Sequence, residues 1–200
     1  SKYIRLPVQS NINVPKNIIE IAHYALPTSV QKVYIPADYT TISHDAFNSC
    51  TSLTEVEFQD VDTLEYIGDY AFFGTSIKEF IGGKNLKAIG QYAFQRCRSL
   101  QVVDLRTSPI INKKDGRMKN RDAYKYEYEL KDNKKDYNDS LGYGAFKGCA
   151  SLYWVYLPKV QQICSDTFTG CKSLKTVIIP TPGSDMKDTT SATDDDAFSQ

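Results

Sequence analysis

The five cysteines and two histidines are the residues of this 200-residue chain best suited to hold a metal ion or to act as nucleophiles. A zinc site needs such ligands in pairs at close spacing, and the sequence contains neither CxxC nor HxxxH. Five cysteines is an odd number and too few for a disulfide scaffold. We therefore expect no metal site, no cofactor and no catalytic centre built from these side chains.

Four of the cysteines share one position of a recurring pattern, in which a small residue and Phe precede two variable residues and Cys. A shared position predicts a shared environment, which we expect to be small and buried, because a buried free Cys behaves as a compact apolar residue. Cys164 lies outside this register, beside Ile163, and is a candidate for exposure. The four in register are Cys50, Cys97, Cys149 and Cys171, and Thr75 replaces Cys in the third unit.

His23 and His44 also share a position, two residues after a recurring Ile. Other units place Asp, Gln, Tyr or Ser there, which is typical of a side chain that faces solvent. The chain contains no convincing glycine-rich phosphate loop, nucleophile elbow or paired-carboxylate motif. These observations favour a protein that is not an enzyme.

The elements that carry these positions repeat along the chain. A small residue and a large apolar residue recur, and a further apolar residue usually lies five positions before the large one. A segment of the form LxxVx[IL], often ended by Pro, follows in most units. The recurring pairs are Ala25-Leu26, Ala46-Phe47, Ala71-Phe72, Ala93-Phe94, Ala145-Phe146, Thr167-Phe168 and Ala197-Phe198.

The period of this pattern predicts the fold. Undisturbed units repeat every 21 to 25 residues, which is too short for a domain and long enough for one turn of a coil. One turn cannot bury its own apolar face, so the turns must stack and share a continuous core. The alternating LxxVx[IL] segment suits a half-buried strand, and Pro ends it by removing a hydrogen-bond donor. We expect a single β-rich solenoid domain over residues 1–200, with about seven repeats and one parallel sheet along a face.

The segments IGDYAFFGTSIKEF, IGQYAFQRCRSLQVVDL and ICSDTFTGCKSLKTVIIP resemble the BspA-like class of leucine-rich repeats. This resemblance covers nearly the whole chain. It implies a right-handed solenoid and a place on secreted or surface proteins of bacteria and some protists, where such proteins are associated with adhesion. It also implies that no shared catalytic site can be carried over.

One unit is enlarged by about 30 residues, which predicts an inserted loop at about residues 107–140. The loop is rich in charge and tyrosine, and its AYKYEYEL stretch suits an exposed strand. Insertions within repeats map to loops on one face, often the binding face. The sequence leaves two alternatives open, a binding loop or a solvated loop without a role.

The bulk composition excludes several classes of partner. Basic and acidic residues balance at 24 each, so we expect neither nucleic acid nor an anionic membrane as a general target. No apolar run is long enough to span a membrane, and SKYIRLPVQS lacks the apolar core of a secretion signal. We expect the chain to work outside the cell or at the cell surface, with its signal or anchor outside this sequence.

The outward positions of the strands supply the candidate binding residues. The third and fifth residues of LxxVx[IL] point away from the core and form two rows on the sheet. The strand after the insertion places its two aromatic residues in these rows, beside apolar and acidic neighbours, as a recognition surface requires. The alternative is that the insertion folds over this patch and buries it. The candidates are Trp154, Tyr156, Tyr34, Val102, Asp104 and Ile178.

We therefore predict a non-catalytic binding module that recognises a protein or glycan on a host or microbial surface. One alternative is a structural spacer within a larger surface protein. A second is an enzyme whose site is formed by the insertion.

Overall fold

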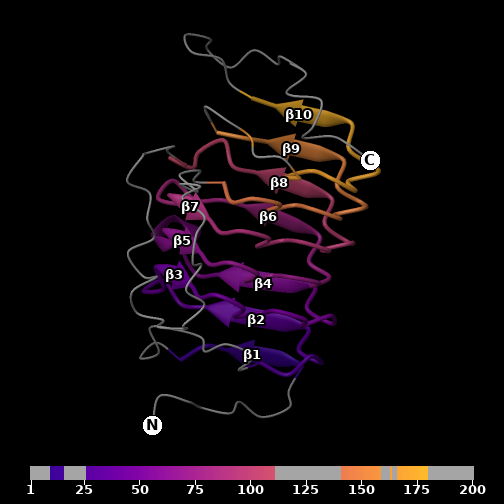
Figure 1. Cartoon of the computed structure of the whole chain (residues 1–200). Coiled ribbons are helices and arrows are strands. Elements are labelled where there is room, and N and C mark those ends of the chain that lie inside the picture. Colours follow the sequence, from indigo (N-terminus) through magenta and orange to yellow (C-terminus); the bar gives the residue numbers. More distant parts are fainter. Residues whose placement is uncertain (1–9, 16–25, 111–140, 159–162, 164–165, 180–200) are drawn as a thin grey trace, which may run out of the picture.

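A computed structural model describes residues 10–15, 26–110, 141–158, 163 and 166–179, and Figure 1 shows these residues as a stack of coils. Short strands follow one another along one side of the stack. They are β1 (Asn11–Asn13), β2 (Lys32–Ile35), β4 (Glu55–Phe58), β6 (Glu79–Ile81), β8 (Val102–Asp104), β9 (Trp154–Tyr156) and β10 (Thr176–Ile178).

All pairs between these strands are parallel, which confirms the predicted β-solenoid. They form two sheets, in the orders β1-β2-β4 and β6-β8-β9-β10. The register places equivalent repeat positions opposite one another, for example Val33 with Val56 and Phe80 with Val103. Each coil therefore contributes its inward and outward residues to the same rows.

A second series of strands lies on another side of the coils, to the left in Figure 1. It comprises β3 (Thr41–Ile42), β5 (Tyr66–Ile67) and β7 (Ala88–Ile89), extended by a bridge from Ile89 to Leu141. The recurring Ile lies here and points into the core. Gly90 follows β7, and a Cβ at this position would lie 2.5 Å from the backbone nitrogen of Asp69 in the preceding coil. The IG dipeptide thus allows close stacking of the coils. A 3-10 helix, η1 (Val61–Thr63), connects β4 to β5.

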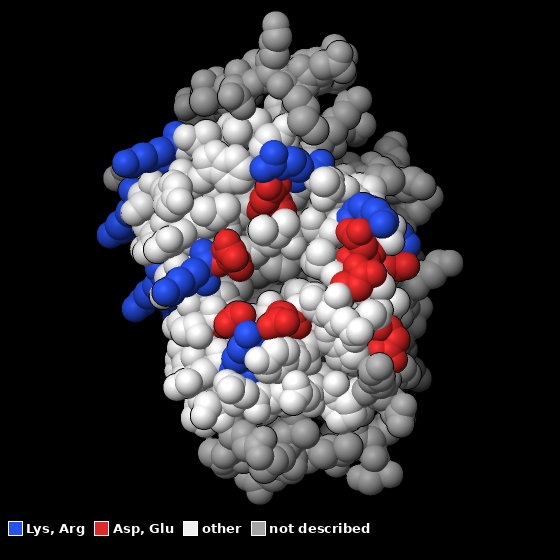
Figure 2. All heavy atoms as spheres, turned by 180° about the vertical axis from the view of Figure 1, so that it is seen from behind, with Lys and Arg blue, Asp and Glu red and all other residues white. Residues whose placement is uncertain are grey.

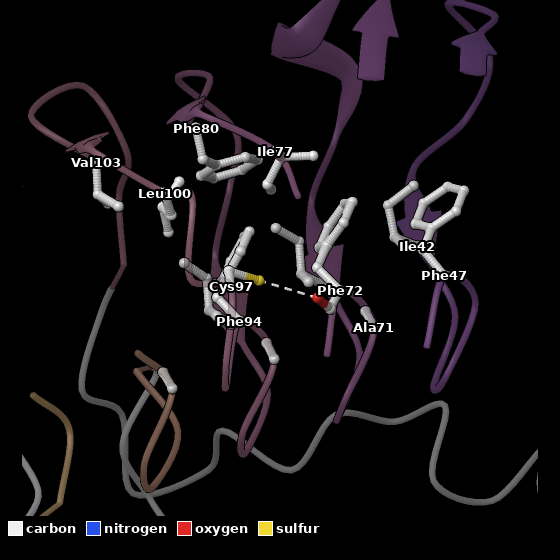
Figure 3. Packing of buried hydrophobic residues seen from close by; sticks show 14 of the residues in the cluster. Ile42, Phe47, Ala71, Phe72, Ile77, Phe80, Phe94, Cys97, Leu100 and Val103 are labelled. Atoms are coloured by element: carbon white, nitrogen blue, oxygen red, sulfur yellow. Dashed lines mark hydrogen bonds between the residues drawn. The ribbon is translucent and has the colours of Figure 1, made fainter. Parts of the chain in front are cut away.

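The recurring phenylalanines form one column inside the solenoid, within the continuous core that the sequence predicted. Successive ring centroids are 5.0, 5.0, 5.4 and 5.8 Å apart, and each of these four pairs is stacked. Figure 3 shows part of this column next to the inward residues of the strands. The members, all buried, are Phe47, Phe72, Phe94, Phe146 and Phe168.

The turns that carry the column contain pairs of residues in the left-handed region, with φ between 53° and 77°. The backbone of these turns also links the coils, since Tyr92 N donates to Tyr143 O (2.9 Å) and Arg96 N to Lys147 O (2.8 Å). These bonds offset the steric cost of a left-handed Tyr or Arg. The first members of the pairs are Asp45, Tyr70, Tyr92, Gly144 and Asp166, and the second are Ser49, Gly74, Arg96, Gly148 and Gly170.

Three of the four in-register cysteines, Cys97, Cys149 and Cys171, form a ladder of thiol hydrogen bonds. The Cys97 Sγ donates to the carbonyl of Phe72 (3.0 Å), as Figure 3 shows, and the Cys149 Sγ donates to that of Phe94 (3.1 Å). Cys171 repeats the bond toward Phe146 (3.2 Å). All four in-register cysteines are free, and burial is confirmed for all except Cys171, which is partly exposed.

Three further expectations concern the two histidines and Cys164. The side chain of His44 is 42% exposed and lies 3.2 Å from Asp45, which fits a position near solvent. His23 and Cys164 lie outside the described residues.

The first four residues of the expected insertion, 107–110, are among the described residues. Residues 107–110 belong to the coil, because the Thr107 and Ser108 hydroxyls both donate to carbonyls of the preceding coil (3.1 Å each) and Ile110 is buried. The rest of the predicted insertion, residues 111–140, lies outside the described residues. None of the described residues forms a helix that is long and apolar enough to cross a membrane.

Candidate binding face

The four-stranded sheet brings most of the predicted binding residues together. Its register places Val102 beside Trp154 in one outward row. The other outward row runs from Ile81 through Asp104 and Tyr156 to Ile178. We call these residues, together with Arg106, the sheet face.

Tyr34 lies apart from this group, because β2 belongs to the other sheet. Its ring contacts the Lys32 ammonium, 4.7 Å from the ring centroid. The same ammonium forms ion pairs with Glu55 (2.7 Å) and Glu57 (2.8 Å). Hydrogen bonds to these two carboxylates raise the pKa of Lys32 above its usual range. The structure thus places Tyr34 in a charged cluster rather than in the aromatic patch.

The two aromatic residues of β9 contact each other on the sheet face. Their ring centroids are 6.0 Å apart, with a tilt of 51° between the planes. Trp154 is half-buried, whereas Tyr156 is only 7% exposed and Ile178 only 8%. The expectation that all these outward side chains face solvent is therefore wrong for Tyr156 and Ile178. The large apolar side chain that the face does expose is Ile81, at 54%.

Arg106 connects the acidic and aromatic parts of the sheet face. Its Nε donates to both Asp104 oxygens (3.0 and 2.9 Å), and its Nη2 donates to Oδ2 (2.6 Å). The guanidinium carbon lies 4.9 Å from the Tyr156 ring centroid and 5.9 Å from that of Trp154. Partial burial opposes ionisation of Asp104, but the bonds from Arg106 outweigh it and hold the pKa of Asp104 below its usual value.

Sequence reasoning missed three residues near this site. Arg106 follows Asp104 by two positions, so the strand alternation, continued one step beyond the six-residue pattern, would have placed it on the same face. Ile81 stands in the predicted outward row, but its exposure depends on the neighbouring side chains. Tyr153 directly precedes β9 and is 43% exposed, but it is the second residue of its LxxVx[IL] segment, a position that was not counted among the outward ones.

The arrangement is suited to recognition rather than to acid–base chemistry. The Asp104 carboxylate is already engaged by Arg106, and the exposed part of the guanidinium can donate further hydrogen bonds. Ile81 and Trp154 add apolar and aromatic surface. Across the described part of the chain, no three His, Cys, Asp or Glu side chains gather as a metal site would require.

Comparisons with known proteins agree with this architecture. A family model described as BspA type Leucine rich repeat region matches residues 8–101 and 124–195 in six copies, where the sequence predicted about seven repeats. No curated protein matches the chain significantly.

Two crystal structures share the fold. One is a leucine-rich repeat protein from Bacteroides ovatus, with 24% identity, a TM-score of 0.62, and coverage of 86% of this chain and 37% of that chain. The other is the T. pallidum leucine-rich repeat protein, with 18% identity, a TM-score of 0.50, and coverage of 87% and 79%. This chain thus spans little more than a third of the Bacteroides protein.

Proposed function

Because the chain belongs to the BspA-type leucine-rich-repeat family, we propose that it is a non-catalytic, extracellular or cell-surface binding module that recognises a protein or glycan on a host or microbial surface. The observation that carries this proposal is the sheet face. There an exposed Ile81 and a half-buried Trp154 lie beside the guanidinium of Arg106.

The composition of the sheet face supports a binding role. Trp, Tyr and Arg are the residues most often found at binding hot spots, because they add large contact area or several donors. Strand pairing holds Trp154 at a fixed position between β8 and β10, so little conformational entropy remains to be lost on binding. Ile81, 54% exposed on the edge strand β6, extends the apolar surface beside these residues.

A structural spacer is the second candidate function. It is favoured by the length of the Bacteroides protein, of which this chain spans only 37%. A segment of a long array can hold another domain at a distance without contacting a partner itself.

A binding screen separates the two functions. The chain would be tested on an immobilised panel of extracellular-matrix proteins and glycans, together with the variant Ile81→Asp. The control is Asn13→Asp, which adds the same charge to the equivalent outward row of β1, at the other end of the solenoid. We expect at least one probe to bind the chain and the control but not Ile81→Asp. If no probe binds, the spacer is favoured. If the chain, Ile81→Asp and Asn13→Asp bind a probe equally well, its binding site lies outside the sheet face.

A further inference from the structure

Basic side chains that form no ion pair with any other described residue gather at one corner of the solenoid. This corner is formed by the turns that lead from the Phe column to the main strands, at residues 48–54, 73–78, 95–101, 147–153 and 169–175. None of these five segments contains Asp or Glu. We call their exposed cations the basic edge, and they are Lys78, Arg96, Arg98, Lys172 and Lys175.

The pairing of charges distinguishes the basic edge from the other faces. The remaining described cations all form ion pairs, as Lys84 does with Asp62 (2.9 Å), Lys87 with Glu65 (2.6 Å) and Lys147 with Asp166 (2.9 Å). In Figure 2, blue side chains line the left side of the view, whereas the blue side chains over the middle and the right side lie next to red ones. The chain as a whole has a formal net charge of zero, so this separation reflects placement and not composition.

The coils hold part of this edge as a regular row. Gln101 N donates to Lys78 O (2.8 Å), Tyr153 N to Gln101 O (3.1 Å), and Lys175 N to Tyr153 O (3.1 Å). Successive members of the row are therefore about 4.8 Å apart, the usual spacing of paired strands. The row therefore has the ammonium groups of Lys78 and Lys175 at its two ends. Between them lie the amide of Gln101 and the ring of Tyr153, which is 43% exposed. Arg98 and Lys172 belong to the same turns, three residues before Gln101 and Lys175 respectively.

We infer that the basic edge binds a linear anionic polysaccharide, carrying sulfate or carboxylate groups, that lies along the solenoid axis. This inference goes beyond the proposed function, because the basic edge is a second surface, apart from the sheet face, with a ligand class of its own. Lysine and arginine side chains attract the anionic groups, and the Arg guanidinium can hold a sulfate or carboxylate by two hydrogen bonds. Tyr153 supplies a flat surface against which a sugar ring packs.

The composition of the edge favours this ligand over two others. A protein partner requires a desolvated apolar centre, and apart from Tyr153 the exposed residues of these turns are polar or charged. A single-stranded nucleic acid binds by stacking successive bases on several aromatic residues, whereas this edge exposes one.

Binding of heparin, used as the probe, tests the inference. We compare the chain with the triple variant Arg98→Gln, Lys172→Gln, Lys175→Gln. The control triple variant is Lys32→Gln, Lys84→Gln, Lys87→Gln, which removes the same number of charges from paired cations. All three proteins are first checked by thermal unfolding. We expect heparin affinity to fall at least about tenfold in the edge variant, because each lost contact removes counterion release, and to change less than about twofold in the control.

Several results would overturn the inference. They are a failure of the chain to bind heparin, an equal loss in the control, and an equal or tighter affinity for oligo-dT that the edge variant also loses. If heparin does not bind while a probe sensitive to Ile81→Asp does, the inference fails and the proposed function stands. If no probe binds at either surface, both fail.

Discussion

At the residue scale, the repeat gives buried side chains such as the in-register cysteines a defined partner in the neighbouring coil. Cys97 shows this, because its thiol donates to the Phe72 carbonyl while Thr75 lies 3.3 Å from its sulfur. The sequence predicted burial of this position from its recurrence. It could not predict the bond to a carbonyl, because that depends on the stacking distance of the coils.

The thiols provide the first prediction. Burial raises the pKa of Cys50 to about 11 and raises that of Cys149 as well, so neither forms the reactive thiolate at neutral pH. We expect Cys50, Cys97 and Cys149 to react with a thiol reagent only after unfolding, as measured by labelling with mass spectrometry. Rapid labelling of these three in the native protein, or a mass that reveals disulfides among them, would contradict the burial of these thiols.

Asp166 provides a prediction on pH. Hydrogen bonds from Tyr143, Lys147 and Thr169 lower the pKa of Asp166 to about 2, below the value of about 3.9 for an unfolded Asp. Its contribution to stability is therefore fully present above about pH 4 and is lost as the pH falls toward 2.

The variant Asp166→Asn isolates this effect, because Asn also tolerates the left-handed backbone of residue 166 (φ 64°). In urea unfolding we expect the variant to be less stable than the parent at pH 7 and the difference to shrink by pH 2. A difference that stays constant over this range would show that the carboxylate charge is not involved.

At the element scale, the strands and their register follow from the sequence, and the turns follow only in part. The LxxVx[IL] alternation predicted the inward and outward rows that β8 and β9 show. The left-handed turn positions carry Gly in some coils and Tyr or Arg in others, so no residue type marks them throughout. The packing of Ser108 and Ile110 against the preceding coil was not predicted, because both lie beyond the LxxVx[IL] segment and their contacts depend on how the coils stack.

Two deletions of different length test where the packed coil ends and the insertion begins. We expect replacement of residues 111–140 by a short flexible linker to leave the thermal unfolding transition nearly unchanged, because loop-closure entropy depends only weakly on loop length. Removal of 107–140 should lower stability, since it also deletes the hydroxyl bonds of Thr107 and Ser108 and the buried Ile110. Equal loss in both deletions would show that the segment 111–140 is itself part of the packed core.

At the scale of the whole molecule, one apolar column unites the coils. The ring of Phe94 stacks between Phe72 (5.0 Å) and Phe146 (5.4 Å) and also contacts Phe80 (4.9 Å). The column was predictable because it needs only a fixed offset in the repeat. The candidate binding face was predicted less completely, since neither the burial of Tyr156 nor its contact with Arg106 from the neighbouring coil follows from the strand alternation.

Truncation of the column gives a prediction for the fold. We expect Phe94→Ala to lower the free energy of unfolding by roughly 3–5 kcal/mol, the usual range for a buried Phe. Phe73→Ala is the matched control, because Phe73 is only partly buried and lies outside the column. A comparable small loss in both variants, measured by urea unfolding, would argue against a shared core.

The central claim is that inward residues hold the solenoid together while the sheet face binds a partner, and Trp154→Ala tests it most directly. The measurement combines urea unfolding with the affinity for the probe found in the binding screen. We predict a loss of about 2 kcal/mol or more in binding, which is roughly thirtyfold, together with a loss of stability well below that of Phe94→Ala. Unchanged affinity, or a loss of stability as large as that of Phe94→Ala, would contradict the claim.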